Sequence, residues 1–236
     1  MSYPLFIGKF EGDFLVLTDD EYHHAVKVRR LKEGDKVEVN DLQGNIYLGE
    51  ILKIEKNKAL IKPIQKQDIK IPDYKITLYQ CMPNQLSKID DIIEPISQLG
   101  VDRFVPVLSK NSAVKQSDVE KKIQKWEKIA LNSIKQCRRL YPVSIDKPVK
   151  LSNINSYDDL KVVFYEKEYE RKTKDLIGKT FQNCSIVIGN EGGFKEDEIN
   201  LLVDKGFLPL SLGNYILKME TAIIVGICQI KIILER

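Results

Sequence analysis

The sequence lacks most of the patterns that assign a chain to a familiar chemical class. Its four cysteines lie far apart without a CxxC pair, and with only two histidines it offers no spacing typical of a zinc site. It has no G-x-G-x-x-G fingerprint and no phosphate loop ending in Lys-Ser or Lys-Thr. These absences argue against a Rossmann-type dinucleotide enzyme, and we expect no metal.

Long hydrophobic runs and a strong charge imbalance are also missing. The most apolar run, Ala222 to Cys228, is too short to span a bilayer, so we expect no membrane partner. The net charge is only +3, so any affinity for nucleic acid must come from local patches. Scattered cysteines without a recognisable signal peptide favour a cytoplasmic location.

Two loops containing glycine dominate the C-terminal part of the chain. The first, Gly189 to Phe194, follows a predicted strand at 186–188 and precedes a predicted helix at 196–205. The second, Gly213 to Lys218, follows a strand at 207–212 and precedes an apolar helix that begins at Met219. Glycine pairs after strands are usually simple turns. Ligands of open α/β sheets nevertheless collect where strands end, so the paired loops favour a ligand site.

The residues of these loops resemble a known family. IGNEGGF and SLGNYILKMETA resemble the part of the SPOUT methyltransferases that binds S-adenosyl-L-methionine (SAM). More narrowly, they resemble the RsmE family, which methylates N3 of a uridine in small-subunit ribosomal RNA and whose patterns are IGPEGGF and SLGxRILRxETA. Asn190 replaces a proline with its fixed φ, Lys218 replaces an arginine with its planar fork, and Met219 replaces a threonine. LGVDRFVPV and KQCRRLYPV extend the likeness over nearly the whole chain.

The predicted elements divide the chain near residue 70. Alternating strands at Lys36 to Asn40, Asn45 to Ile54 and Ala59 to Ile64 indicate a small β domain, which resembles the PUA-like barrel of the family. From Ile76 onward, strands alternate with helices, which predicts a parallel sheet covered on both faces. We expect a PUA-like β-barrel RNA-binding domain at 1–70 and an α/β SPOUT methyltransferase domain at 71–236. The resemblance also implies a C-terminal trefoil knot.

SAM is the cofactor that the resemblance implies. The pocket would consist largely of backbone from the two loops, with apolar side chains against the ligand and two residues from the end of a neighbouring strand. The candidates are Tyr165, Glu166, Ile188, Gly189, Asn190, Glu191, Gly192, Gly193, Leu212, Gly213, Ile216, Leu217 and Thr221.

Catalysis would require alignment of the methyl group and a cation near the target base. Uridine N3 must lose its proton, and a cation favours the resulting anion. Lys218 is the candidate by its match to the basic position of the family, and Arg139 would assist. Lys218 could instead simply pair with Glu220. Glu191 and Glu220 could equally hold backbone amides at a helix start, so we assign no general base.

Basic residues near the N-terminus are candidates for RNA contact. Thr18-Asp19-Asp20-Glu21 predicts a capping box, and the helix that it opens would place His23, Lys27 and Arg30 on one face. The segment HHAVKVRRLKEGD resembles the family pattern HHxxxVxRxxxGD. Taken alone, such a stripe is usually a solvated helix face, whereas beside an RNA-modifying domain it would bind phosphate. Arg29 and Arg138 complete the predicted RNA-binding set.

The resemblance implies 16S ribosomal RNA or the assembled small subunit as substrate, at a uridine of the decoding region. It also implies a homodimer, for which Ile223, Ile224, Ile227 and Ile230 of the final helix would offer apolar surface. Two other functions stay open. One is a SPOUT methyltransferase acting on a ribose 2′-oxygen or a guanine nitrogen. The other is a non-enzymatic RNA-binding assembly factor, against which the intact glycine loops argue.

Overall fold

The computed structural model describes residues 3–235, which divide into two compact units. The first unit reaches Ile71 and also includes Leu131–Pro142, and the second comprises the rest of the chain from Pro72 onward. The segment 131–142 therefore groups with the N-terminal unit, whereas the predicted boundary assigns it to the domain at 71–236. Leu140 explains this grouping, because its side chain packs with Leu5 and Ile46.

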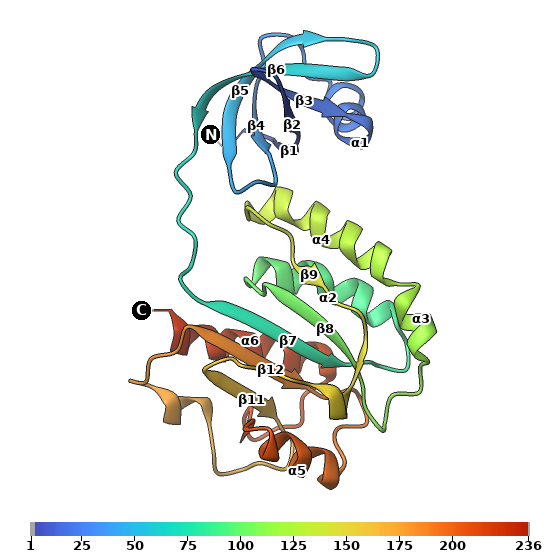
Figure 1. Ribbon diagram of the computed structural model, residues 1–236, viewed down its shortest axis with the longest axis vertical. Helices are drawn as coiled ribbons and strands as arrows, with labels where there is room; N and C mark the ends of the chain where they lie inside the picture. Colours follow the sequence, from blue (N-terminus) through green and yellow to red (C-terminus); the bar gives the residue numbers. More distant parts are fainter. Residues whose placement is uncertain (1–2, 236) are drawn as a thin grey trace. The chain divides into compact units, whose positions relative to one another are not determined.

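A curled six-stranded sheet forms the first unit (Figure 1). Its order is β1-β4-β5-β6-β3-β2, antiparallel except where β1 pairs with β4. The strands are β1 (Leu5–Ile7), β2 (Lys9–Glu11), β3 (Phe14–Thr18), β4 (Lys36–Asn40), β5 (Ile46–Ile54) and β6 (Lys58–Lys66). Phe6, Leu15 and Ile61 are fully buried in its core. Every second residue in the middle of three strands belongs to this core, which confirms the predicted small β domain: Leu15 and Leu17, Val37 and Val39, and Ala59 and Ile61.

The predicted capping box at 18–21 is wrong. Thr18 makes no side-chain bond to the helix that follows, and Glu21 instead accepts hydrogen bonds from the Ile7 amide (3.0 Å) and from Lys135 (2.6 Å). Only α1 (Asp19–Tyr22) is α-helical, and η1 (His23–Val28) is a π-helix. The wider π turn removes the spacing of 3.6 residues per turn on which the predicted basic face depended.

The second unit is an α/β unit built on a parallel sheet. Its order is β10-β8-β7-β12-β11-β13, with short β9 beside β8. The strands are β7 (Lys75–Cys81), β8 (Arg103–Leu108), β9 (Ser144–Ile145), β10 (Val149–Lys150), β11 (Leu160–Phe164), β12 (Asn183–Ile188) and β13 (Leu208–Leu210). The helices are α2 (Ser87–Gln98), α3 (Gln116–Glu120), α4 (Ile123–Cys137), α5 (Glu196–Asp204) and α6 (Met219–Leu234), with short 3₁₀ turns η2 (Leu151–Asn153) and η3 (Thr173–Leu176). The last residues of α4, from Leu131 on, belong to the first unit.

Both faces of this sheet are covered, as predicted. Neighbouring residues of β7 show it, because Leu78 belongs to the core beneath α2 and α6, whereas Tyr79 belongs to the core beneath α5. Trp126 of α4 is fully buried in the first of these cores and donates its indole N–H to Asp90 at 2.8 Å. A parallel sheet requires this double cover because both of its faces are apolar.

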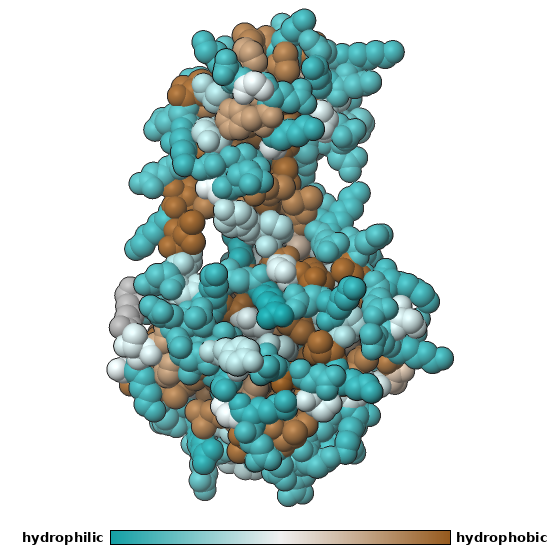
Figure 2. Space-filling model, in the orientation of Figure 1, coloured by the Kyte–Doolittle hydropathy of each residue, from teal (hydrophilic) through white to brown (hydrophobic). Residues whose placement is uncertain are grey.

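The final helix does not carry the apolar surface that the sequence suggested for a partner. Of the four predicted residues, Ile223, Ile227 and Ile230 are fully buried in the core of their own unit, and Ile224 is partly buried. Ile232 at the far end of α6 is 70% exposed. The face drawn in Figure 2 is mostly hydrophilic, with apolar residues scattered between polar ones. None of the described helices is both long enough and apolar enough to cross a membrane.

Candidate functional site

Three neighbouring strands bring the two glycine loops to the carboxyl ends of the parallel strands. We call this end of the sheet the loop edge. β11 lies between β12 and β13, and Phe164 is in register with both Ile188 and Leu210. All three strands are parallel, so the loops that follow them leave from the same edge. Tyr165 and Glu166, which follow β11, lie between the two loops. The structure therefore brings together the strand-end residues and loops that the sequence named as a cofactor site.

The first loop is tied down by side-chain amides. The buried Asn190 donates to the carbonyl of Met82 and accepts from the amide of Gly192, both at 3.0 Å. Asn111 donates to the carbonyls of Gly192 at 2.7 Å and Gly193 at 3.1 Å. Asn190 stands where the family pattern has proline, and its side chain supplies through hydrogen bonds a constraint that a proline ring would supply covalently.

Gly193 is required at its position for two reasons. Its φ is +60°, a left-handed conformation that L side chains rarely adopt. A Cβ there would also lie 2.5 Å from Oε1 of Glu166. The Glu166 carboxylate thus packs directly against the loop backbone.

Gln80 is a residue of this edge that sequence reasoning missed. It is fully buried at the end of β7, and its side-chain amide donates to the carbonyls of Cys81 at 2.7 Å and Gly189 at 3.2 Å. The register pairs Gln80 with Ile188, so it lies beside the start of the first loop. A polar residue inside the apolar run 76–81 was a signal that could have found it.

Lys88 was also missed, and it contacts both glutamates near the loops. Its Nζ lies 2.7 Å from Oε1 of Glu191 and 3.4 Å from Oε1 of Glu220. The hydrogen bond to Glu191 raises the pKa of Lys88. Burial disfavours the charged form of Glu191, but the hydrogen bonds and charge of Lys88 outweigh it and lower the pKa of that carboxyl group. Lys88 lies in the first turn of α2, the helix after β7, and that position at the loop edge was a usable signal.

The second loop is far more open than the first. Tyr215 is 86% exposed and Ile216 is 85% exposed, and a Cβ at Gly213 would meet nothing within 4 Å. The hydrogen bonds of Gly213 are local, because the Ser211 hydroxyl accepts from the Gly213 amide (3.2 Å) and donates to its carbonyl (3.1 Å). Leu212 and Leu217 are partly buried, and Thr221 is exposed.

Lys218 lies at the N-cap of α6 with its side chain exposed. The alternative role that the sequence left open for it, an ion pair with Glu220, is not formed among the described residues. Glu220 faces Lys88 instead. The Lys218 ammonium therefore remains available to a bound partner.

Comparisons with known proteins agree with this arrangement. A family described as RNA methyltransferase domain matches residues 70–231, and a family described as RNA methyltransferase PUA domain matches residues 17–64. Ribosomal RNA small subunit methyltransferase E of Aquifex aeolicus is 34% identical over 216 residues, which are 90% of this chain and 92% of that protein. The chain belongs to the RsmE family of RNA methyltransferases. The family that the loop residues indicated is confirmed.

Solved structures share the fold of this RsmE-family chain. A methyltransferase from Legionella pneumophila in complex with SAM has a TM-score of 0.86 at 23% identity, and the match covers 98% of each chain. Ribosomal RNA small subunit methyltransferase E from Neisseria gonorrhoeae, bound to SAM, has a TM-score of 0.86 at 21% identity, again with 98% of each chain covered. These matches confirm an α/β unit joined to a PUA-like one.

The residues that the sequence predicts to bind RNA all lie in the first unit of this RsmE-family chain. His23, Lys27, Arg29 and Arg30 are exposed. His24, by contrast, packs edge-on against Phe6, and burial, followed by the charge of Lys135, lowers its pKa. Among the described residues, no group of three or more histidine, cysteine or acidic side chains is arranged to hold a metal.

The two arginines after α4 are held within the first unit. Arg138 forms an ion pair with Glu38, and the carbonyl of Arg139 accepts a hydrogen bond from Asn40 at 3.0 Å. Both arginines belong to the segment 131–142, whereas Lys218 and the glycine loops belong to the second unit.

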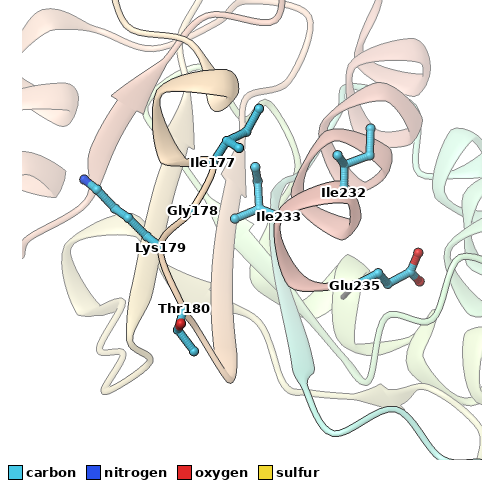
Figure 3. Close-up of a pocket in the computed structure, with 7 residues that line it drawn as sticks. All are labelled: Ile177, Gly178, Lys179, Thr180, Ile232, Ile233 and Glu235. Atoms are coloured by element: carbon cyan, nitrogen blue, oxygen red, sulfur yellow. The ribbon is translucent and has the colours of Figure 1, made fainter.

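A small pocket lies at the other edge of the parallel sheet (Figure 3). Ile177 to Thr180 and the end of α6, from Ile232 to Glu235, line it. α6 starts at the loop edge and ends near Tyr74, which directly precedes β7. The Tyr74 hydroxyl donates to Glu235 at 2.7 Å. The pocket is therefore separate from the glycine loops.

Proposed function

We propose that this chain is a SAM-dependent methyltransferase that modifies N3 of a uridine in the decoding region of 16S ribosomal RNA. The observation that carries the proposal is the convergence of two glycine loops, with Glu166 between them, at one sheet edge of an RsmE-family chain. RsmE-family membership favours uridine N3 over a ribose oxygen or a guanine nitrogen.

The residues at this edge fit the proposed cofactor. The glycine backbone at 189–193 allows close approach of a planar ligand, and Leu212, Ile216 and Leu217 offer apolar contacts on the facing loop. When bound, SAM supplies a methyl group on a positively charged sulfur. The chain's own task is to align this group with the base, and such positioning provides much of the rate.

Lys218 acts on the base in this proposal. Its exposed ammonium stabilises the negative charge that develops on the uracil ring when N3 loses its proton to solvent. Arg139 is the second catalytic candidate of the proposal. Glu191 is poorly suited to remove that proton, because its pKa is lowered and its carboxylate accepts from Lys88. The proposal therefore includes no general base.

RNA binding is assigned to the first unit. His23, Lys27, Arg29 and Arg30 would contact phosphates, which position the substrate without reading its sequence. Arg138 would have to exchange Glu38 for phosphate. We also infer a cytoplasmic homodimer with a C-terminal trefoil knot, acting on 16S rRNA or on the assembled small subunit.

The test is to incubate the protein with labelled SAM and ribosomal RNA, with and without bound ribosomal proteins, and to map the methylated atom by nucleoside mass spectrometry. Methyl on uridine N3 is expected. Methyl on a ribose oxygen or a guanine nitrogen would replace the proposal with another SPOUT activity. RNA binding without SAM binding would indicate an assembly factor.

Lys218→Met tests the catalytic assignment. Loss of one charge-stabilising group should lower kcat about 100-fold at saturating SAM. Lys147→Met is the matched control, because Lys147 is an exposed lysine between β9 and β10, at the other side of the sheet from β13. Unchanged turnover in Lys218→Met would remove this lysine from the mechanism.

A further inference from the structure

One lysine outside both loops connects them. Lys88 lies in the first turn of α2, Glu191 lies within the first glycine loop, and Glu220 lies in the first turn of α6, just after the second. We propose that Lys88 is a positioning residue that holds the loop 189–193 and the start of α6 at the spacing that SAM requires. This inference rests on the proposed function.

The base of this bridge is rigid. Ile89, Ile92 and Ile93 follow Lys88 in α2, and all three are buried in the core of the second unit. The backbone amides of Asn84 and of Glu191 itself also favour the charged form of the Glu191 carboxyl group and help to lower its pKa. On the other side, Met219 is buried beside Glu220 and fixes the start of α6.

Lys88 differs from an ordinary surface ion pair because it contacts two carboxylates. Both carboxylates lie within reach of a single ammonium, at 2.7 Å and 3.4 Å. Without Lys88, Glu191 and Glu220 would be two neighbouring like charges and would repel each other. Because they belong to different loop ends, this repulsion would drive apart the two sides of the proposed cofactor site.

Another ion pair in this region lacks these properties. Lys110 pairs with Asp197 of α5, but the two side chains are 58% and 63% exposed. This pair does not connect the two glycine loops. Lys88 and its glutamates are each about one-third exposed, so solvent screens their interactions less.

The test is isothermal titration of SAM into wild type, Lys88→Met, Lys88→Arg and the control Lys122→Met. Lys122 is 32% exposed, as Lys88 is 33%, and it pairs with Asp90 of α2 instead of with Glu191 or Glu220. Loss of the bridge should raise the SAM Kd about fivefold in Lys88→Met. Arginine should keep Kd within about twofold of wild type, and the control should leave it unchanged. kcat at saturating SAM should fall less than KM rises.

Glu220→Gln supplies a readout that a merely structural role would not move. In the wild type this change removes one arm of the bridge and should raise Kd about twofold. In the Lys88→Met background it removes the repulsion instead and should lower Kd. A double-mutant cycle detects this reversal of sign. If Lys88→Met does not fold, Lys88→Gln takes its place in the same cycle.

The outcomes separate this inference from the proposed function. Wild-type binding of SAM with an unchanged Kd in the Lys88 variants would overturn the positioning role and leave the methyltransferase proposal standing. The same sign of the Glu220→Gln effect in both backgrounds would also overturn it. Failure of the wild type to bind SAM would instead remove the proposed function itself.

Discussion

The two glycine loops at the edge of the sheet are held in opposite ways. Side chains from three other segments form hydrogen bonds to the first loop, namely Gln80, Lys88 and Asn111, and the Glu166 carboxylate packs against Gly193. In the second loop Tyr215 and Ile216 are almost fully exposed, and the hydrogen bonds of Gly213 go only to the neighbouring Ser211. The first loop is therefore organised before a ligand arrives, whereas the second has apolar surface that a ligand can bury. Preorganisation on one side and closure on the other would together define the cofactor site.

Gly193→Val tests the rigid side and should have the largest effect. The left-handed φ strains a β-branched residue, and its Cβ would displace Glu166. A cost of about 2 kcal/mol corresponds to a rise of about 30-fold in the SAM Kd, measured by calorimetry. Gly12→Val is the matched control, since Gly12 has a φ of +61° in open space within the first unit. Normal SAM binding by a folded Gly193→Val protein would remove this loop from the site.

Asn190→Ala removes the hydrogen bonds that replace the family's proline. The loss of two bonds that hold the loop should raise the SAM Kd about tenfold. Asn40→Ala provides the control, because Asn40 is fully buried in the first unit and its amide bonds the carbonyls of Arg139 and Leu140. Both variants should lose stability, but only the first should lose SAM affinity. Equal SAM affinities would show that the loop is rigid without its amide tether.

The sequence predicted the loop edge because the signals there are local. The apolar run before Gly189, the acidic first turn from Glu196 and the change to helix at Met219 each occupy a few residues. The structure confirms a strand, β12, that ends at the predicted Ile188, and the start of α6 at the predicted Met219. A parallel sheet then requires that loops after its strands share one edge.

The bonds that hold the first loop could not be predicted in the same way. Asn111 and Gln80 contact residues more than 80 positions away, and no local pattern encodes such pairs. The same applies to Glu21, whose carboxylate binds Lys135 instead of capping its own helix. Local propensity gave the wrong answer there because a tertiary ion pair competed for the same side chain.

Cys81 tests the burial of the end of β7, which lies beneath the first loop. It precedes Met82, whose carbonyl holds Asn190, and burial raises the pKa of its thiol from 9.0 to about 12. A pKa raised in the folded state stabilises the protein below pH 9, and this contribution is lost as the pH rises toward 12. Between pH 9 and pH 10 the unfolding free energy of wild type should therefore fall by about 1 kcal/mol more than that of Cys81→Ala. Urea denaturation at the two pH values measures this difference. An equal fall in the unfolding free energy of both proteins would show that Cys81 is accessible to solvent.

Ile216→Ala tests the open side and should have the smallest effect. The side chain is 85% exposed, so its truncation should leave the thermal midpoint of the free protein unchanged. If the second loop closes over SAM, partial burial of this side chain is lost in the variant, and Kd should rise about threefold. Ile232→Ala, at a position 70% exposed near the end of α6, should change neither quantity. Hydrogen exchange provides an independent readout, because amides at 213–217 should become protected when SAM binds, whereas those at 189–193 should change little. Unchanged exchange at 213–217 together with an unchanged Kd would mean that only the first loop holds the cofactor, and the contrast between the two loops would then have no role in binding.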